Sequence, residues 1–158
     1  EDYLILIDQK EIVFTEGRAG MTRDLGDGVT MKILHPSSPS SDVNESSIVV
    51  KITFGQVSFM LTGDVGQDSE MKILQRGYDL KSTILKVSHH GSIKGTSSSF
   101  LSAVRPTVAV IMCGKENPYG YPHDETLTKL AGARVEIYRT DIQGTIVIIT
   151  DGETFKIN

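Results

Sequence analysis

The sequence predicts an α/β fold with a mixed β-sheet and flanking helices. Two observations indicate this class: short apolar runs with strand character alternate with helical segments in the middle of the chain, and hairpin signals lie toward both ends. Strands joined through a helix pair in parallel, whereas hairpins pair antiparallel, so the sheet is expected to contain both arrangements. A chain of 158 residues with 39% hydrophobic content can form one domain with a substantial core.

The expected strands are short segments that alternate apolar and polar residues or form brief apolar runs between turn residues. In chain order they cover residues 3–7, 11–14, 29–34, 47–54, 56–61, 83–87, 107–112, 134–138, 145–150 and 154–157. Gly55 predicts a hairpin between the fourth and fifth of these strands, and Asp151 with Gly152 predicts another between the last two. Residues 17–28 and 35–47 are expected to be loops, the second an exposed connection beside a functional rim.

Three helices are expected between the later strands. Residues 66–76 carry apolar side chains at helical spacing and end before Gly77, a typical helix C-cap residue. One of the serines 97–99 caps a second helix, which stops before Pro106, and a third helix covers residues 125–131. These helices connect strands that are expected to lie side by side in the sheet.

Composition restricts what the chain can bind by itself. Its net charge is −4 and its pI about 5.5, so no overall basic field attracts nucleic acid, and an anionic substrate needs local help such as a metal ion. The single cysteine, Cys113, excludes an intrachain disulfide and a thiolate zinc cluster. No apolar run approaches the ~20 residues of a membrane-spanning helix, and no signal peptide is recognisable, so this stretch is expected to be soluble. Because it opens on a strand-like run without an initiator Met, we expect it to come from a longer chain.

Polar residues follow two of the expected strands at the point where each strand ends. Asp64 follows the strand 56–61, and His89 and His90 follow the strand 83–87. Strand ends are where open α/β sheets place their chemistry. A simple turn explains Thr-Gly-Asp on its own, but adjacent histidines at a strand end have no obvious packing role. A carboxylate and an imidazole from two strand ends, with one helix between them, fit as a pair of metal ligands.

Together with other positions, these residues carry a resemblance to a known family. The matching residues are Asn44, Ser47-Ile48-Val49, Gly55, Leu61-Thr62-Gly63-Asp64, Glu70, Leu85-Lys86-Val87-Ser88-His89-His90-Gly91-Ser92, Phe100-Leu101, Pro106, Asn117-Pro118-Tyr119-Gly120, Pro122-His123, Arg139-Thr140-Asp141 and Gly144. From about Gly28 onward, the chain resembles the second half of a metallo-β-lactamase-fold hydrolase. The subgroup it resembles is the hydrolase domain of ComEC-type DNA-internalisation competence proteins and their stand-alone relatives.

The resemblance implies one half of an αββα sandwich with a dinuclear metal site at the edge that its two sheets share. By position, Asp64 matches the carboxylate that bridges the metals, and His89 or His90 matches the last histidine ligand. His89 is favoured because it continues the alternation of Leu85 and Val87, which leaves His90 as a neighbouring or substrate-facing group. The metals that such a ligand set implies are two divalent ions, zinc or manganese.

Further residues match the substrate side of the resembled site. Asn44 lies where many superfamily members have another histidine, although the ComEC-like subgroup commonly has Asn. Ser92 and Thr96 suit an anionic group at a helix N-terminus or, equally, ordinary capping. The subgroup tends to have Tyr-Gly-His-Pro, but this chain has Tyr121 at the histidine position, with His123 close by. Arg139 is either paired with Asp141 or free to contact phosphate, and His35 is expected to be structural.

The resemblance implies metal-assisted hydrolysis of a phosphodiester, with DNA as substrate during DNA uptake. The family's first signature, His-x-His-x-Asp-His, is absent from residues 1–158. These residues are therefore expected to form a single domain that is the C-terminal part of the hydrolase. Alone, this part is expected to be inactive and to self-associate. The location implied is an extracytoplasmic soluble domain of a membrane protein, or a cytoplasmic or secreted stand-alone hydrolase. The alternative is a non-catalytic structural or partner-binding module of a DNA-uptake membrane protein, or a hydrolase of another substrate class.

Overall fold

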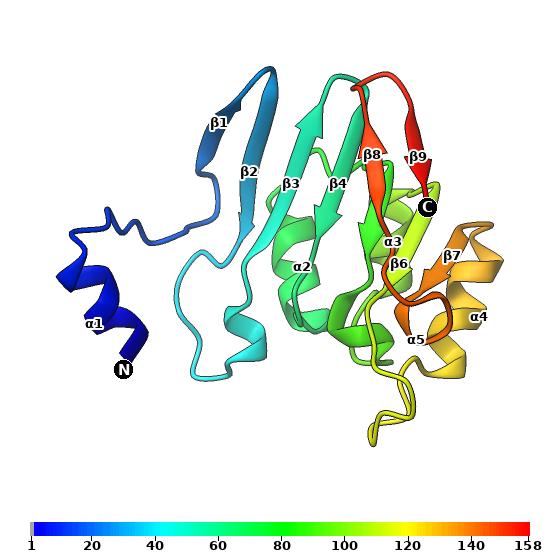
Figure 1. Ribbon diagram of the computed structural model, residues 1–158. Coiled ribbons are helices and arrows are strands. Elements are labelled where there is room, and N and C mark those ends of the chain that lie inside the picture. The colour runs from blue at the N-terminus through cyan, green and yellow to red at the C-terminus, as the bar shows by residue number, and fades with distance from the viewer. Residues whose placement is uncertain (1) are drawn as a thin grey trace.

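A seven-stranded mixed sheet runs through the molecule in the order β1-β2-β3-β4-β5-β6-β7 (Figure 1). The computed structural model describes residues 2–158 and confirms the α/β class. The strands are β1 (Thr22–Gly26), β2 (Val29–His35), β3 (Val49–Phe54), β4 (Val57–Leu61), β5 (Ile84–Lys86), β6 (Val108–Ile111) and β7 (Glu136–Arg139). β1 to β4 pair antiparallel, and β4 to β7 pair in parallel, as the alternation of hairpins and helices predicts.

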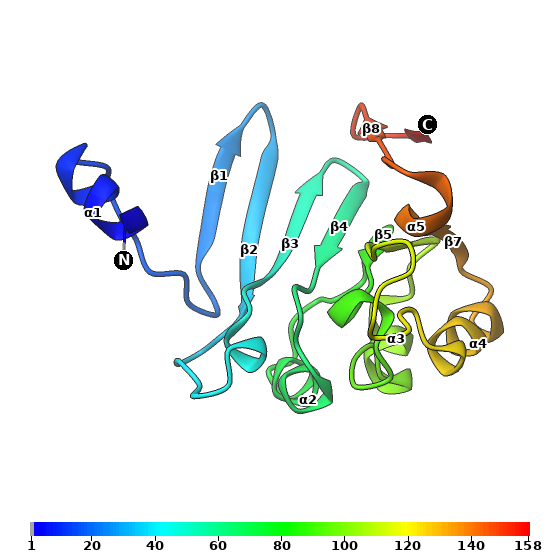
Figure 2. The ribbon, with the colours of Figure 1, turned by 60° about the horizontal axis from the view of Figure 1, so that its bottom comes forward.

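Three helices cover one face of the sheet, and each connects two of the parallel strands (Figures 1 and 2). They are α2 (Gln67–Gln75), α3 (Ser98–Val104) and α4 (Asp124–Gly132). Ser97 caps α3, because its side chain accepts a hydrogen bond from the amide of Phe100, and Phe100 is fully buried. The core between helices and sheet includes Met60, Leu85 and Ile111 from three neighbouring strands.

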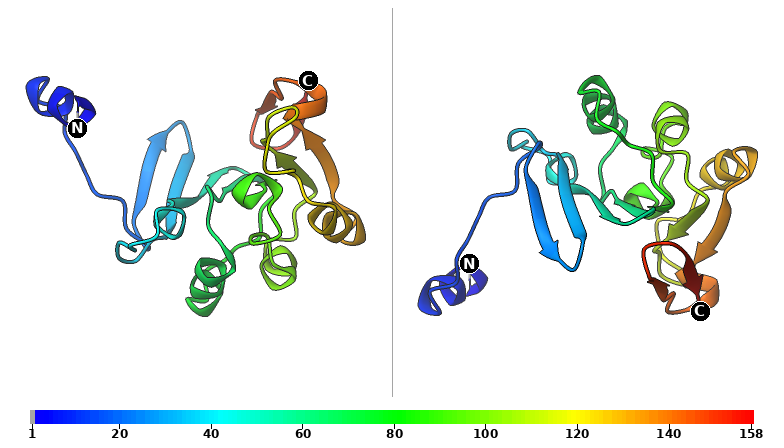
Figure 3. Two further views of the ribbon diagram at one scale, coloured as in Figure 1. Left: turned by 90° about the horizontal axis from the view of Figure 1, so that it is seen from below. Right: turned by 90° about the horizontal axis from the view of Figure 1, so that it is seen from above.

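A short hairpin packs on the opposite face of the sheet (Figure 3). It consists of β8 (Ile148–Thr150) and β9 (Phe155–Ile157), which pair with each other as a separate two-stranded sheet. Side chains from both strands pack against a second cluster of Val57, Ile84 and Val108 from the large sheet. The hairpin expected around Asp151 and Gly152 is therefore confirmed, with shorter strands than the sequence predicts.

Two strands expected before residue 15 are wrong. Residues 3–7 lie in helix α1 (Asp2–Gln9), which stands apart from the sheet in every view, and residues 11–14 form no strand (Figures 1 to 3). A short apolar run cannot distinguish a strand from a helix by periodicity, so the sequence offers no way to separate the two here. Tyr3 and Leu4 are 76% and 60% exposed, which shows that α1 buries little in residues 2–158.

The loop expected over residues 17–28 is also partly wrong, because it contains β1. This edge strand is exposed along its whole length and includes Thr22, Arg23 and Asp24, so it lacks the apolar alternation that signals a buried strand. The missed signal is the pair Asp27 and Gly28, which both have positive φ at the turn into β2. A four-residue helix, α5 (Thr140–Gln143), follows β7 and was likewise not expected.

Candidate functional site

The parallel strands β4, β5 and β6 all end at one edge of the sheet, which carries the candidate site (Figure 1). Asp64 follows β4, His89 and His90 follow β5, and the loop with Tyr121 follows β6. Two hydrogen bonds join the first two turns: the His89 amide donates to Gly63 O (3.1 Å), and Thr62 Oγ1 donates to Lys86 O (2.7 Å). The strand ends therefore bring together residues that are 25 positions apart in the sequence.

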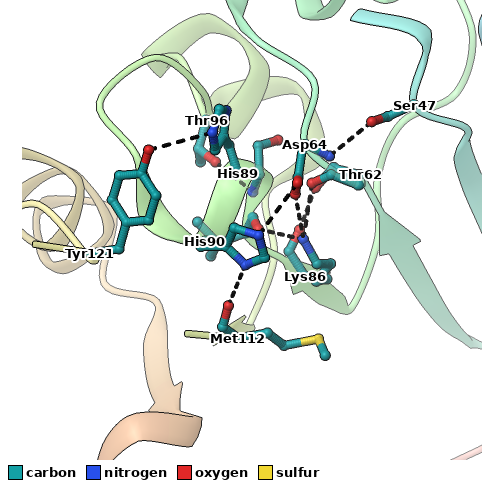
Figure 4. Close-up of polar contacts among 12 residues, drawn as sticks. Ser47, Thr62, Asp64, Lys86, His89, His90, Thr96, Met112 and Tyr121 are labelled. Carbon is teal, nitrogen blue, oxygen red and sulfur yellow. Dashed lines mark hydrogen bonds and ion pairs between the residues drawn. The ribbon is translucent and has the colours of Figure 1, made fainter. Parts of the chain in front are cut away.

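Asp64 and His90 form a close pair at this edge (Figure 4). His90 Nε2 lies 3.4 Å from Asp64 Oδ2, and His90 Nδ1 lies 2.6 Å from the carbonyl oxygen of Met112. A carbonyl oxygen only accepts hydrogen bonds, so Nδ1 carries a proton and Nε2 is left to face the carboxylate. The side chains of His90 and Asp64 are 43% and 35% exposed, respectively, and can therefore be reached from solvent.

The chemistry of this pair fits two ligands of a divalent ion. A histidine that binds metal through one nitrogen usually donates its other N–H to a carbonyl or carboxylate, as His90 does to Met112 O. Two ligands of a tetrahedral zinc ion, each about 2.1 Å from the metal, are themselves about 3.4 Å apart. Two donors alone cannot hold two metal ions, and no cluster of three or more candidate ligands occurs within residues 2–158.

His89 takes a different direction from His90. Its Nε2 lies 3.4 Å from the Tyr121 hydroxyl, and the ring meets Tyr121 edge-on at 5.7 Å between centroids. Strand β5 ends at Lys86, and His89, His90 and Gly91 all have positive φ (48°, 55° and 86°), so strand alternation no longer applies at the histidines. Positive φ at two adjacent non-glycine residues is strained backbone of the kind that clusters at functional sites.

Lys86 is a member of this edge that the sequence reasoning assigned no role. Its Nζ donates to Gly63 O (2.9 Å) and Val87 O (3.2 Å) and lies 3.9 Å from Asp64 Oδ1. Burial lowers the pKa of Lys86, while the Asp64 carboxylate opposes that shift. The sequence pattern that indicates this position of Lys86 is the alternation around it. Leu85 and Val87 are buried on one face of the sheet, so the side chain of Lys86 must point to the opposite face.

The two histidines lie in a turn, Ser88–Gly91 (η2), which we call the histidine turn. Behind it, the fully buried carboxylate of Glu70 holds the loop that follows this turn. Glu70 accepts hydrogen bonds from the amides of Thr96 (2.5 Å) and Ser97 (2.7 Å) and from the Ser88 hydroxyl (3.3 Å). Burial raises the pKa of Glu70, and these donors partly offset the rise. The anion held at the start of α3 is thus the protein's own carboxylate, and an external anion would have to displace it.

The hydroxyls of Ser92 and Thr96 are also engaged within the loop. Both residues are buried, at 2% and 0% exposure. Thr96 Oγ1 accepts from the Ser88 amide (3.1 Å), and Ser92 Oγ lies 3.3 Å from the Lys94 amide. In this arrangement both side chains support the loop, and the residue that caps α3 is Ser97.

Within the described residues, the remaining predicted residues form hydrogen bonds with partners other than Asp64 and His90. Asn44 is exposed in the short helix η1 (Asn44–Ser46), and His123 Nδ1 accepts a hydrogen bond from the Ile93 amide (3.0 Å). Arg139 is paired with Asp141 through two hydrogen bonds of 3.1 and 2.6 Å, so its guanidinium is already occupied. His35 is buried and contacts Glu45 O (2.8 Å), which agrees with its expected structural role.

Gly91 fixes how the histidine turn packs against the loop that follows β6. It has a φ of +86°, and a Cβ at this position would lie 2.5 Å from Pro122 Cβ. We expect Gly91→Ala to lower the free energy of unfolding by about 2–4 kcal/mol, because a strained backbone is combined with a steric clash. Urea unfolding measures the loss. Gly77→Ala is the matched control, since Gly77 also has positive φ (+66°) but nothing within 4 Å of the added methyl; equal losses would contradict the clash.

The geometry describes an α/β protein whose sheet edge presents a carboxylate and an imidazole. No family model matches the chain. It is 36% identical over 115 residues to ComE operon protein 3 of Bacillus subtilis (strain 168), which covers 72% of this chain and 15% of that protein. It is 32% identical over 122 residues to competence protein ComA of Neisseria gonorrhoeae, covering 76% and 18% of the two chains. Recombination protein 2 of Haemophilus influenzae is 34% identical over 120 residues, which are 75% of this chain and 15% of the relative.

One of these relatives is named a competence protein, and another is named a recombination protein. The matched regions span less than a fifth of the length of each of these relatives, so the chain corresponds to a limited segment of them. Within residues 2–158, no helix has both the length and the apolar character needed to cross a bilayer.

Proposed function

We propose that this chain supplies one side of a metal-dependent hydrolase site that cleaves DNA phosphodiesters during competence-linked DNA uptake. The observation that carries the proposal is the Asp64–His90 pair, with a 3.4 Å contact and the second imidazole nitrogen fixed on Met112 O. The name of the related competence protein ComA supports the biological setting. The metallo-β-lactamase fold suggested by the sequence motifs belongs to the same proposal.

In this proposal Asp64 and His90 are the metal ligands, and His89 is the neighbouring polar group beside Tyr121. The contacts favour this assignment over the one based on strand alternation, because His90 faces Asp64 while His89 faces Tyr121. When bound, divalent ions would activate a water and offset charge on the phosphoryl oxygens. Lys86 holds Asp64 in place through its charge and through its bonds to the Gly63 and Val87 carbonyls.

A phosphodiester substrate needs local attraction, because the net charge of the chain is negative. With a net charge of −4, the protein as a whole repels nucleic acid, so binding has to be local. A metal site at the sheet edge provides such local attraction. The other ligands are proposed to come from a further segment of a longer, membrane-associated protein, in line with the small share of each relative that the chain covers.

The test compares this chain with a longer form of the protein that includes the segment preceding it. We expect the longer form to hydrolyse labelled DNA when Mn²⁺ or Zn²⁺ is present, and EDTA to abolish the reaction, because the ligands of both metals are then complete. The chain of 158 residues alone is expected to show weak or no hydrolysis. A longer form that binds no metal and cleaves no DNA would instead favour a non-catalytic module of the uptake machinery.

A further inference from the structure

Three aromatic rings form a stack that leads outward from the candidate site. Tyr121 is stacked on His90 with ring centroids 6.3 Å apart and an interplanar angle of 24°. Tyr119 is stacked on Tyr121 at 5.5 Å and 18°. Tyr119 is 71% exposed, so the outermost ring of the stack lies open to solvent. An exposed tyrosine ring at the end of such a stack offers a flat apolar face to a ligand.

The loop that carries both tyrosines is fixed by Asn117. Its Nδ2 donates to Gly114 O (3.0 Å) and Tyr121 O (2.7 Å), and its Oδ1 accepts from the Tyr121 amide (3.0 Å). These three bonds close the loop on itself across Tyr119. The ring positions are therefore set before a ligand arrives, which reduces the entropy lost on binding.

A cavity of about 420 Å³ lies beside the stack and reaches His90. Two of its polar groups are already used within the protein: Thr140 Oγ1 accepts from the Cys113 amide (2.9 Å), and the Met112 carbonyl contacts His90. Asn117, which also lines the cavity, is engaged as described above. A ligand here is held by ring faces and apolar contact more than by new hydrogen bonds.

We infer that Tyr119 and Tyr121 form a stacking subsite for an unpaired nucleobase of single-stranded nucleic acid. The inference rests on the proposed function, because the Asp64–His90 pair would then hold the phosphodiester of the same nucleotide chain. In a duplex both faces of each base are covered by their neighbours, so only an unstacked base can lie on Tyr119. Binding through ring faces tolerates any base, since every base has such a face.

The experiment measures fluorescence anisotropy of a labelled twelve-nucleotide oligo(dT) and of an abasic chain of the same length and charge, both with Mn²⁺ present, because the 158-residue chain alone is expected to show weak or no hydrolysis. We expect the 158-residue chain to bind oligo(dT) about tenfold more tightly than the abasic chain, as base–aromatic stacking requires. Tyr119→Ala should remove that preference without changing abasic binding, and Tyr119→Phe should keep it. Tyr3→Ala is the matched control, because Tyr3 is similarly exposed (76%) but lies on α1.

The outcomes separate this inference from the proposed function. Equal binding of oligo(dT) and the abasic chain, or a preference that survives Tyr119→Ala, overturns the stacking subsite whether or not the longer protein hydrolyses DNA. Undetectable binding of oligo(dT) also overturns it. A preference for oligo(dT) that depends on Tyr119 supports the subsite even if the longer protein does not hydrolyse DNA. In that case only the proposed hydrolase function is overturned. Tighter, Tyr119-dependent binding of a twelve-base-pair duplex would contradict the choice of a single strand.

Discussion

Replacing Glu70 with alanine is expected to lower the free energy of unfolding by about 3 kcal/mol or more. The reason is that the Glu70 carboxylate accepts from two backbone amides, of Thr96 and Ser97, and from the Ser88 hydroxyl. Its removal leaves these donors without partners beside a small cavity, since Glu70 is fully buried. Urea unfolding followed by circular dichroism measures the loss.

The matched control for Glu70→Ala is Asp68→Ala. Both residues lie in the first half of α2, but Asp68 is exposed, so its removal costs only the interaction with the helix dipole, below about 1 kcal/mol. Comparable losses for the two variants would show that the buried hydrogen bonds of Glu70 add nothing. The histidine turn adjoins this network through Ser88, so metal binding by the longer protein should weaken in Glu70→Ala as well.

Glu70→Gln tests the pH dependence that burial of this carboxyl creates. Burial raises the pKa of Glu70 above its ordinary value of 4.5, so the folded protein holds the proton more tightly than the unfolded chain does. Its contribution to stability is thus fully present below pH 4.5 and is lost as the pH rises through the folded-state pKa. The stability of wild type relative to Glu70→Gln should therefore fall as the pH rises above about 4.5, and a relative stability that rises instead would contradict the assignment.

Sequence patterns predict the middle of this fold well because local signals and tertiary packing agree there. The apolar spacing and Gly77 define α2, Ser97 caps α3, and Gly55 turns the hairpin of β3 and β4, and each of these appears in the structure. The N-terminal region is predicted poorly. There, α1 buries little of its surface within residues 2–158, and β1 is held by ladder hydrogen bonds that do not depend on its side chains.

The candidate site is predictable at the level of strand ends but not of individual contacts. Asp64 and the two histidines were identified because their strands stop before them, and the structure does place all three at one edge. Which histidine meets Asp64 depends on the positive φ angles of His89 and His90, which non-glycine residues rarely adopt and no side-chain pattern predicts. The role of Glu70 was equally hidden, because a glutamate in an amphipathic helix is ordinarily solvated.

Asp64→Asn in the longer form of the protein is expected to reduce DNA hydrolysis by about 100-fold or more and to lower its metal content. The amide keeps the size of the carboxylate but removes the negative charge that faces His90 Nε2 at 3.4 Å. Hydrolysis of labelled DNA and metal analysis by mass spectrometry are measured on the same samples. Asp68→Asn is the control, because Asp68 is an exposed carboxylate on the neighbouring helix α2. Unchanged metal content and hydrolysis in Asp64→Asn would remove Asp64 from the site.

The same assay decides between the two histidines. His90→Ala should lower metal content as Asp64→Asn does, because both side chains would be ligands, whereas His89→Ala should leave it near the wild-type level. In the double variant of Asp64 and His90, the losses should be far from additive, since removal of either ligand already opens the site. Metal lost in His89→Ala but retained in His90→Ala would restore the assignment that strand alternation favours and would show that the turn rearranges when metal binds.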